Sequence, residues 1–373
     1  MFRNLWAHLF ALRAQGVFLI IQHQLKLQFT KPQQEKVEHW ISHLHKLYNK
    51  KLDQLFQSLV DPLLYDKIHL NKMRFQNSEA GLCEQITVPS EAIQGTLLIV
   101  FDAFTRWRKK LAKKPRFKSW KKKPLSSINL ISPLTHKQIT DHKVKLPLLG
   151  EVKFRSAPIP EGKIKKKQIL KKASGYYLTL YIEALPKKIP ITGDEIVGID
   201  PGYKTNLTLS NGEMIEKPKH FHRLSKRLAK AQKGKNKKLV ARLHERIANS
   251  RKNDNHHISK YLVSKCKYIA YSKDNIQNMA KMFGKSVSEA GHYQLSRMIA
   301  YKAEVNGRQF EDISGSYTTC TCSKCLEKTG PTTFKGLKLR KWKCAICQAE
   351  HDRDVNAAAV TLLKATGAVS TTS

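Results

Sequence analysis

Four of the seven cysteines in the chain form two C-x-x-C pairs. The first pair is Cys322 and Cys325, and the second is Cys344 and Cys347. Two pairs at this separation are typical of a zinc site in which four thiolates surround the ion as a tetrahedron. Because the cysteines fill every position around the metal, none is left for a substrate. The sequence therefore predicts a zinc ribbon whose metal is structural.

Two aspartates flank this ribbon along the chain. Asp200 ends the apolar segment Glu195–Asp200, and Asp354 lies at the start of an expected helix that opens with Asp352. Nucleases that use two Mg²⁺ ions need converging carboxylates, and this pair could belong to such a site. A structural alternative stays open, because an Asp after a strand often forms a turn and an Asp at a helix start is often its cap.

The chain as a whole is strongly basic. It has 68 Lys and Arg against 29 Asp and Glu, a formal charge of +39 over 373 residues. Solubility needs a charge of only about 2–8 in a small domain, whereas cations placed on phosphates gain affinity by counterion release. Membrane lipids and acidic proteins also attract basic chains, but here the charge extends along the whole length. Nucleic acid is therefore the expected partner.

Aromatic side chains are interleaved with cations in two segments, residues 113–123 and residues 335–342. Proteins hold single strands by combining contacts to phosphates with aromatic rings on which bases stack. A solvated basic loop would explain the first segment equally well. The candidate nucleic-acid contacts are Arg116, Phe117, Lys118, Trp120, Lys341 and Trp342.

The elements that must position these groups follow from hydrophobic periodicity and turn residues. Residues 17–29 predict a strand, and residues 30–112 are mostly helical, with Thr30 as the N-cap of the first helix. Short strands separated by Pro and Gly in residues 113–190 predict a small β-barrel or sandwich. Near the N-terminus, Arg13 and Gln15 interrupt the apolar residues between Leu5 and Ile21, so no apolar run reaches about 18 residues, and no cleavage site follows. We therefore expect a cytoplasmic protein, nucleoid-associated if bacterial.

The second half of the chain has both strand and helix patterns. An apolar strand ends at Asp200, and Ser210–Gly212 predicts a hairpin turn. A basic helical stretch, a short strand, a helix and a further strand follow at residues 220–252, 268–271, 286–304 and 309–313. The whole chain is expected to be a multidomain protein of α+β and α/β character.

The order of these motifs resembles TnpB, a family of transposon-encoded RNA-guided DNA endonucleases related to type V CRISPR effectors. The matching motifs are Gly198–Gly202, the basic helical stretch, the ribbon cysteines and Asp352–Ala358. Arg116–Lys118 and Tyr317–Thr319 are also similar. The resemblance covers residues 17–365, and its most specific part is the C-terminal third.

The resemblance implies an N-terminal β-barrel interrupted by a helical recognition domain, then a RuvC-like RNase H fold with the ribbon inserted before its last helix. The implied partners are a guide RNA and a target DNA, with no membrane. Base pairing would supply sequence specificity while the protein reads a short flanking motif. The expected parts are a possible extension (1–16), the barrel (17–29 and 113–190), the helical domain (30–112), the nuclease domain (195–318 and 349–367), the ribbon (319–348) and a tail (368–373).

The same resemblance assigns the catalytic site. Asp200 and Asp354 match the first and third metal-binding positions of the family's nuclease, which implies Mg²⁺ as a cofactor if the site is catalytic. The second position is usually a Glu, but this chain has Ser272 there. A hydroxyl is a poor Mg²⁺ ligand compared with a carboxylate, and losing one of three charges should cost several kcal/mol of transition-state stabilisation.

Two other carboxylates could replace the missing one. Glu289 on the following helix is the catalytic candidate, although Ser286 and Glu289 also fit a capping box, which is common at the start of apolar helices. Asp274 ranks lower, because it lies two residues past the strand end, where its direction is unconstrained.

Three functions stay open from the sequence. The first is an RNA-guided DNA-binding protein that cleaves DNA with Mg²⁺ through a relocated carboxylate. The second is an RNA-guided repressor or targeting factor that binds DNA without cutting it. A structural RNA-binding protein ranks lowest, because it gives no reason for Asp200 and Asp354 to bracket the ribbon.

Overall fold

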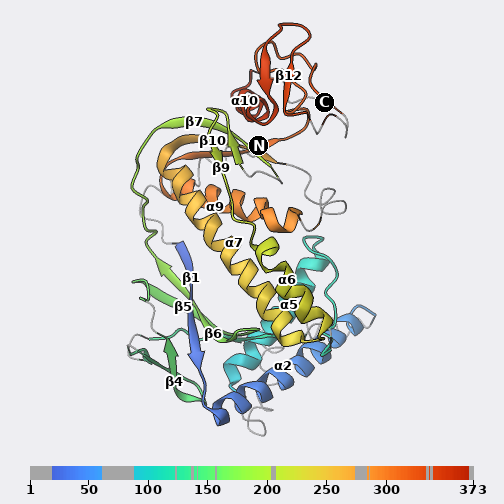
Figure 1. The fold of residues 1–373 in the computed structure, drawn as a ribbon. Coiled ribbons are helices and arrows are strands. Elements are labelled where there is room, and N and C mark those ends of the chain that lie inside the picture. The colour runs from blue at the N-terminus through green and yellow to red at the C-terminus, as the bar shows by residue number, and fades with distance from the viewer. Residues whose placement is uncertain are drawn as a thin grey trace. The chain divides into compact units, whose positions relative to one another are not determined.

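The chain forms two compact units, Met1–Pro186 and Lys187–Ser373. Figure 1 shows the course of the chain through the strands and helices of each unit. The computed structural model describes residues 19–60, 88–121, 124–135, 138–140, 142–155, 158–202, 207–273, 284, 286–332, 336 and 339–368.

The first unit is built on an antiparallel sheet of six strands in the order β2-β5-β6-β1-β4-β3. Strands β1 and β6 pair over most of their length, with Leu25 opposite Leu178, and both side chains are buried. The expected short strands are therefore present, while closure into a barrel stays a prediction. The strands are β1 (Leu19–Gln28), β2 (Ser127–Leu130), β3 (Lys143–Leu146), β4 (Gly150–Arg155), β5 (Lys163–Lys172) and β6 (Gly175–Ala184).

Strand β5 was not predicted from the sequence, because its lysines hide the alternation of a strand. Ile164 and Ile169 point into the core, while most of the lysines stay at the surface. Lys167 is the exception, with 2% of its side chain exposed. Its ammonium lies 3.3 Å from Glu91 Oε2 and donates to the carbonyl and the hydroxyl of Ser132 at 3.0 and 2.8 Å. A buried cation needs such partners to remain charged.

Two long helices, α2 (Lys31–Gln57) and α5 (Ser90–Arg108), pack on this sheet. The start of α2 confirms the expected cap: the Thr30 hydroxyl accepts from the Gln33 amide, and the Gln33 side chain accepts from the Thr30 amide. Helix α5 approaches β2 closely at Gly95, where a Cβ atom would lie 2.5 Å from the Asn129 carbonyl oxygen.

The second unit has a five-stranded mixed sheet in the order β11-β10-β7-β8-β9. Strand β10 runs parallel to both β7 and β11, whereas β8 runs antiparallel to β7 and β9. The expected hairpin thus joins β8 to β9. The strands are β7 (Glu195–Pro201), β8 (Leu207–Leu209), β9 (Met214–Ile215), β10 (Cys266–Lys273) and β11 (Gln309–Ser314).

Helices cover both faces of this sheet. On one face, Ile199 and Tyr271 pack with side chains of α7 (Lys237–Lys265) and α9 (His292–Val305), including Leu262 and Leu295. On the other face lies α10 (Arg353–Ala365), which contacts β7, β8, β10 and β11. A further helix, α6 (His220–Lys233), packs on α7.

The helix expected over residues 286–304 is divided in two. Residues 286–290 are helical, and Gly291 with a φ of +60° separates them from α9. A left-handed φ of this kind interrupts the helix and suits glycine.

A two-stranded sheet joins β12 (Lys341–Lys343), within the expected ribbon, to β13 (Glu350–Asp352), just past its expected end at residue 348. The strands pair so that Trp342 lies opposite His351. Strand β13 continues directly into α10. None of the helices in the described ranges combines the length and the apolar character that a bilayer crossing demands.

Candidate functional site

The four ribbon cysteines lie together. The sulfur atoms of Cys322, Cys325, Cys344 and Cys347 are all within 4.8 Å of one another, and two of the Sγ–Sγ distances are 3.6 Å. Four sulfurs bonded at about 2.3 Å to a tetrahedral ion would be separated by about 3.8 Å, so the observed spacing suits a metal. The cluster can therefore hold a metal ion.

Each cysteine pair is shaped by the same backbone turn. The Leu326 amide donates to the Cys322 carbonyl at 2.9 Å, and the Gln348 amide donates to the Cys344 carbonyl at 3.1 Å. Leu326 and Gln348 both have a positive φ, 68° and 58°. The pKa of Cys344 is lowered to about 6 by the Thr329 hydroxyl, which donates to its sulfur, and by backbone amides. These donors favour the thiolate form of Cys344, which is the form that metals bind.

Asp200 and Ser272 lie side by side at the carboxyl ends of parallel strands. Strands β7 and β10 pair in register up to Ile199 and Tyr271, so Asp200 and Ser272 follow as the next neighbours. Side chains alternate along a strand, and residues in register on parallel strands point to the same face. Because Ile199 and Tyr271 face α7 and α9, Asp200 and Ser272 face α10.

Helix α10 brings Asp354 toward this strand end. Gly198 of β7 lies against its backbone, and a Cβ atom there would be 2.0 Å from the Ala358 carbonyl oxygen. Asp200 is two residues beyond Gly198, and Asp354 is one helical turn before Ala358. This close approach, which a glycine permits, places both aspartates on the α10 face of the sheet.

The two aspartates at the start of α10 have different partners. The Asp352 carboxylate accepts from the amides of Asp354 and Val355 at 3.0 and 3.1 Å, so the cap expected from the sequence is present at this residue. The Asp354 carboxylate instead pairs with Arg340 at 2.5 Å and Arg353 at 2.9 Å. Guanidinium groups therefore contact both carboxylate oxygens of Asp354.

Ser272 is deeply buried where the family resemblance places a carboxylate. Only 1% of the residue is exposed, and its hydroxyl has no hydrogen-bond partner among the described residues. A buried hydroxyl without a partner is uncommon, because its desolvation is not compensated.

Of the two carboxylates that could replace the missing one, the structure describes the contacts of Glu289. The Glu289 carboxylate accepts from the amides of Phe221 at 2.9 Å and His222 at 3.3 Å, and so caps the start of α6 rather than the start of its own helix. An anionic group at this position gains from the exposed amides and the helix dipole. Asp274 lies outside the described residues.

The described residues do not fit a site for two Mg²⁺ ions. Asp200 and Asp354 lie on the α10 face of the sheet, but the residue expected at the second metal-binding position is Ser272, which offers only a hydroxyl, and arginines already neutralise Asp354. Within the described ranges, neither Asp200 nor Asp354 belongs to a group of three His, Cys, Asp or Glu side chains close enough to share one ion. Three converging carboxylates would be the better donor set for this hard ion.

The basic segment of the first unit is held on α2. Asn49 bonds both the amide and the carbonyl of Lys118, at 2.8 and 3.0 Å. Phe117 and Trp120 remain about half exposed, at 51% and 52%, and Arg116 is exposed. The aromatic rings are thus available at a fixed surface among cations, as base stacking requires.

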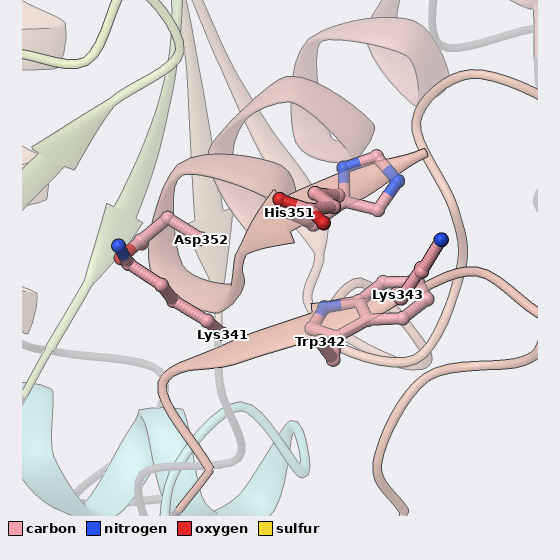
Figure 2. Close-up of a pocket in the computed structure, with 6 residues that line it drawn as sticks. Lys341, Trp342, Lys343, His351 and Asp352 are labelled. Atoms are coloured by element: carbon pink, nitrogen blue, oxygen red, sulfur yellow. The ribbon is translucent and has the colours of Figure 1, made fainter. Parts of the chain in front are cut away.

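In the second unit, Lys341 and Trp342 lie on the short sheet of the ribbon. With Lys343, Glu350, His351 and Asp352 they line an open pocket of about 460 Å³ (Figure 2). The Trp342 ring lies 4.7 Å from the His351 ring at an angle of 36°. The two candidate contact segments belong to different units.

Three side chains with a place in this arrangement had no role in the sequence analysis. They are Arg340 and Arg353, which hold Asp354, and His351, whose Nε2 lies 3.0 Å from Cys322 Sγ. A histidine four residues after the last cysteine was the available signal, since imidazole is a common partner at metal sites.

Known families match most of the second unit. Residues 183–282 match the OrfB_IS605 family, described as a probable transposase, and residues 292–361 match the Cas12f1-like TNB domain.

Similar proteins come from several bacteria. A putative RNA-guided DNA endonuclease of Streptomyces pristinaespiralis is 32% identical over 298 residues, which cover 75% of this chain and 71% of that protein. The putative RNA-guided DNA endonuclease InsQ of Escherichia coli K12 is 25% identical, with 72% and 73% covered. In the cryo-EM structure of a Cas12f1-sgRNA-target DNA complex, a chain superimposes with a TM-score of 0.51 at 14% identity, covering 92% of this chain and 99% of that one. This last likeness concerns the fold.

Proposed function

Since the chain belongs to the TnpB family of RNA-guided DNA endonucleases, we propose that it binds a guide RNA and uses it to bind matching DNA without cutting that DNA. The observation that carries the second half of this proposal is Ser272. It fills the second metal-binding position of the family with a buried, neutral hydroxyl beside Asp200.

The relocation of a carboxylate has less support than it had from the sequence. Glu289 is engaged by two amides at the start of α6, and moving it to a metal would leave those amides without their acceptor. Unsatisfied amides of this kind cost about 1–3 kcal/mol each where they are buried. Asp274 is the remaining carboxylate, and the cleavage experiment tests it directly.

The parts of the molecule take their roles from the same proposal. The six-stranded sheet of β1–β6 would form the RNA-binding barrel, and α2 and α5 the helical recognition domain. The mixed sheet with α7, α9 and α10 would be the RuvC-like domain. Its two aspartates would then serve structure or strand binding rather than hydrolysis.

The metal of the ribbon is proposed to be zinc. Four sulfur donors around one position are the set that Zn²⁺ prefers, and they close its coordination sphere. The ion would fix the fold of residues 319–348 and expose no ligand position. Lys341 and Trp342 would then contact nucleic acid from a rigid support.

The charge of the protein supplies affinity, and the guide supplies specificity. A chain with a formal charge of +39 binds the phosphates of any nucleic acid, whatever its base sequence. Discrimination between DNA sequences therefore has to come from base pairing with the guide. A protein that holds DNA in this way blocks access to it, which suits a repressor or a targeting factor.

The test begins with the full-length protein purified together with its RNA. Sequencing that RNA identifies the guide, and DNA that matches it is compared with scrambled DNA for binding and for cutting in Mg²⁺ or Mn²⁺. We expect tight binding to the matched DNA and recovery of that DNA uncut. Copurification of ribosomal RNA alone, with no preference for any DNA, would support a structural RNA-binding protein instead.

A further inference from the structure

His351 lies in β13, close to both the cysteine cluster and the Trp342 ring. Its Nε2 lies 3.0 Å from the Cys322 sulfur, and its ring lies 4.7 Å from the ring of Trp342 at an angle of 36°. Trp342 is the residue opposite it in the strand pair. Both His351 and Cys322 are buried, at 9% and 0% exposure. The imidazole therefore lies between the Trp342 ring and a sulfur of the metal cluster, with one nitrogen at hydrogen-bond distance from that sulfur. Figure 2 shows His351 and Trp342 on the two neighbouring strands.

The chemistry of the cluster fixes the direction of this hydrogen bond. A cysteine bound to a metal is a thiolate and can only accept. Nε2 must then carry the imidazole proton and donate a hydrogen bond to the Cys322 sulfur. Hydrogen bonds to metal-bound ligands reduce the charge on those ligands and orient them, and their loss typically weakens metal binding by about 10–100-fold.

The contact between His351 and Cys322 lies next to the start of α10. Asp352 directly follows His351 and caps the helix through the amides of Asp354 and Val355. From within the helix, Asn356 accepts from the Ser323 amide at 2.9 Å and donates to the Thr321 carbonyl at 2.7 Å. The helix thus holds the backbone on both sides of Cys322, and His351 reaches the sulfur of the same residue.

We propose that His351 is a positioning residue that links the metal of the ribbon to the start of α10. It donates a hydrogen bond from Nε2 to the metal-bound thiolate of Cys322, and metal occupancy in turn fixes the strand that caps α10. The inference rests on the proposed metal site and is independent of whether the protein binds RNA or cuts DNA.

The first test replaces the metal by Co²⁺ in the full-length protein and measures the sulfur-to-cobalt charge-transfer band and the affinity for Zn²⁺ by competition with a chelator. In His351→Ala we expect a shifted band and an affinity about 10–100-fold lower. His351→Gln, whose amide can still donate, should recover part of both. Lys343→Ala is the matched control, because this exposed residue lies in the same strand pair, and it should change neither.

The second test follows hydrogen exchange at the first turn of α10. Removal of the metal should accelerate exchange at Asp354 and Val355, and His351→Ala should do so even with metal bound. An unchanged band and an unchanged affinity in His351→Ala would overturn the proposal. Weaker metal binding with unaltered exchange in α10 would overturn the link to the helix.

These outcomes are separable from the other proposals. If no charge-transfer band forms in the unaltered protein, the four-cysteine metal site fails and this inference fails with it. If the band forms and shifts in His351→Ala as expected, the inference stands whatever the results for RNA binding and DNA cleavage.

Discussion

Asp352 and Asp354 lie two residues apart, yet their carboxylates have different partners. Asp352 accepts from the first free amides of α10, whereas Asp354 is held by Arg340 and Arg353. A carboxylate that caps a helix and one that faces a neighbouring strand have the same sequence signature. The structure separates them because it shows which atoms the oxygens contact.

The cap at Asp352 has a measurable effect on stability. Asp352→Ala should lower the free energy of unfolding of the second unit by about 0.5–2 kcal/mol, because two helix amides lose their acceptor. Asp352→Asn keeps an oxygen in place and should cost less. Urea unfolding monitored by circular dichroism measures both, and equal losses in the two variants would exclude the cap as the cause.

Much of the candidate site was accessible from the sequence at this scale. The cysteine spacing identified a cluster that can hold a metal, whereas the place of Ser272 at the second metal position of the family stays a prediction. The partner of Glu289 could not be predicted, because the amides of Phe221 and His222 are brought to it by packing between distant helices. The pairing of Asp354 with Arg340 and Arg353 was also not predicted, because the sequence does not show which way the Asp354 carboxylate points.

At the scale of elements, His292 ties the start of α9 to the end of β7. Its Nε2 donates to the Gly202 carbonyl at 3.0 Å, and its side chain is buried. Burial, with a contribution from Lys217, lowers the pKa of His292 from 6.5 to about 3. The folded protein therefore keeps this imidazole neutral where the unfolded chain protonates it.

This difference predicts a pH dependence of stability. Below a pH of 6.5 the unfolded chain takes up a proton that the folded protein does not, so the free energy of unfolding falls as the pH drops toward 3. Between pH 7.5 and pH 5.5 the loss from this residue should be about 1 kcal/mol. Urea unfolding at the two pH values should show the loss in the unaltered protein and a smaller one in His292→Gln. Identical losses would contradict the assignment.

The basic segment, residues 113–123, is held against α2, and we expect its aromatic and its charged side chains to affect RNA binding in different ways. Phe117→Ala and Trp120→Ala should each weaken RNA binding by about 1–3 kcal/mol without changing its salt dependence, because they remove stacking. Arg116→Gln should lower the salt slope by about 1, because it removes a phosphate contact. Affinities measured over a series of salt concentrations distinguish the two. Leu111→Ala is a control at a neighbouring exposed residue, and a matching loss there would refute the specific role of the rings.

At the scale of the whole molecule, the charge of +39 governs association with nucleic acid. Binding of RNA should weaken by at least about 10³-fold between 50 and 200 mM salt, as for proteins that contact 6–10 phosphates. Filter binding or fluorescence anisotropy gives the slope. A weak salt dependence would contradict binding through the phosphate backbone.

The mixed α/β character of the protein was predictable from the sequence, because strand and helix patterns occur in both halves, while the barrel and the RuvC-like fold stay predictions. Both α2 with its Thr30 cap and the hairpin after β8 were expected and are present. Strand β5 was missed, because its many lysines hide the alternation of apolar and polar residues that predicts a strand. The pairing order of the strands depends on contacts between distant segments, which local patterns do not encode.

Ser272, in place of a carboxylate, is proposed to prevent cleavage while the protein still binds its DNA target. The direct measurement is a cleavage time course on matched DNA in Mg²⁺, comparing the unaltered protein with Ser272→Glu and with the uncharged Ser272→Gln. We predict that all three bind the DNA, that only Ser272→Glu cuts it, and that adding Asp200→Ala abolishes this cutting. Mg²⁺-dependent cutting by the unaltered protein that is lost in Asp274→Ala or Glu289→Ala would contradict the account.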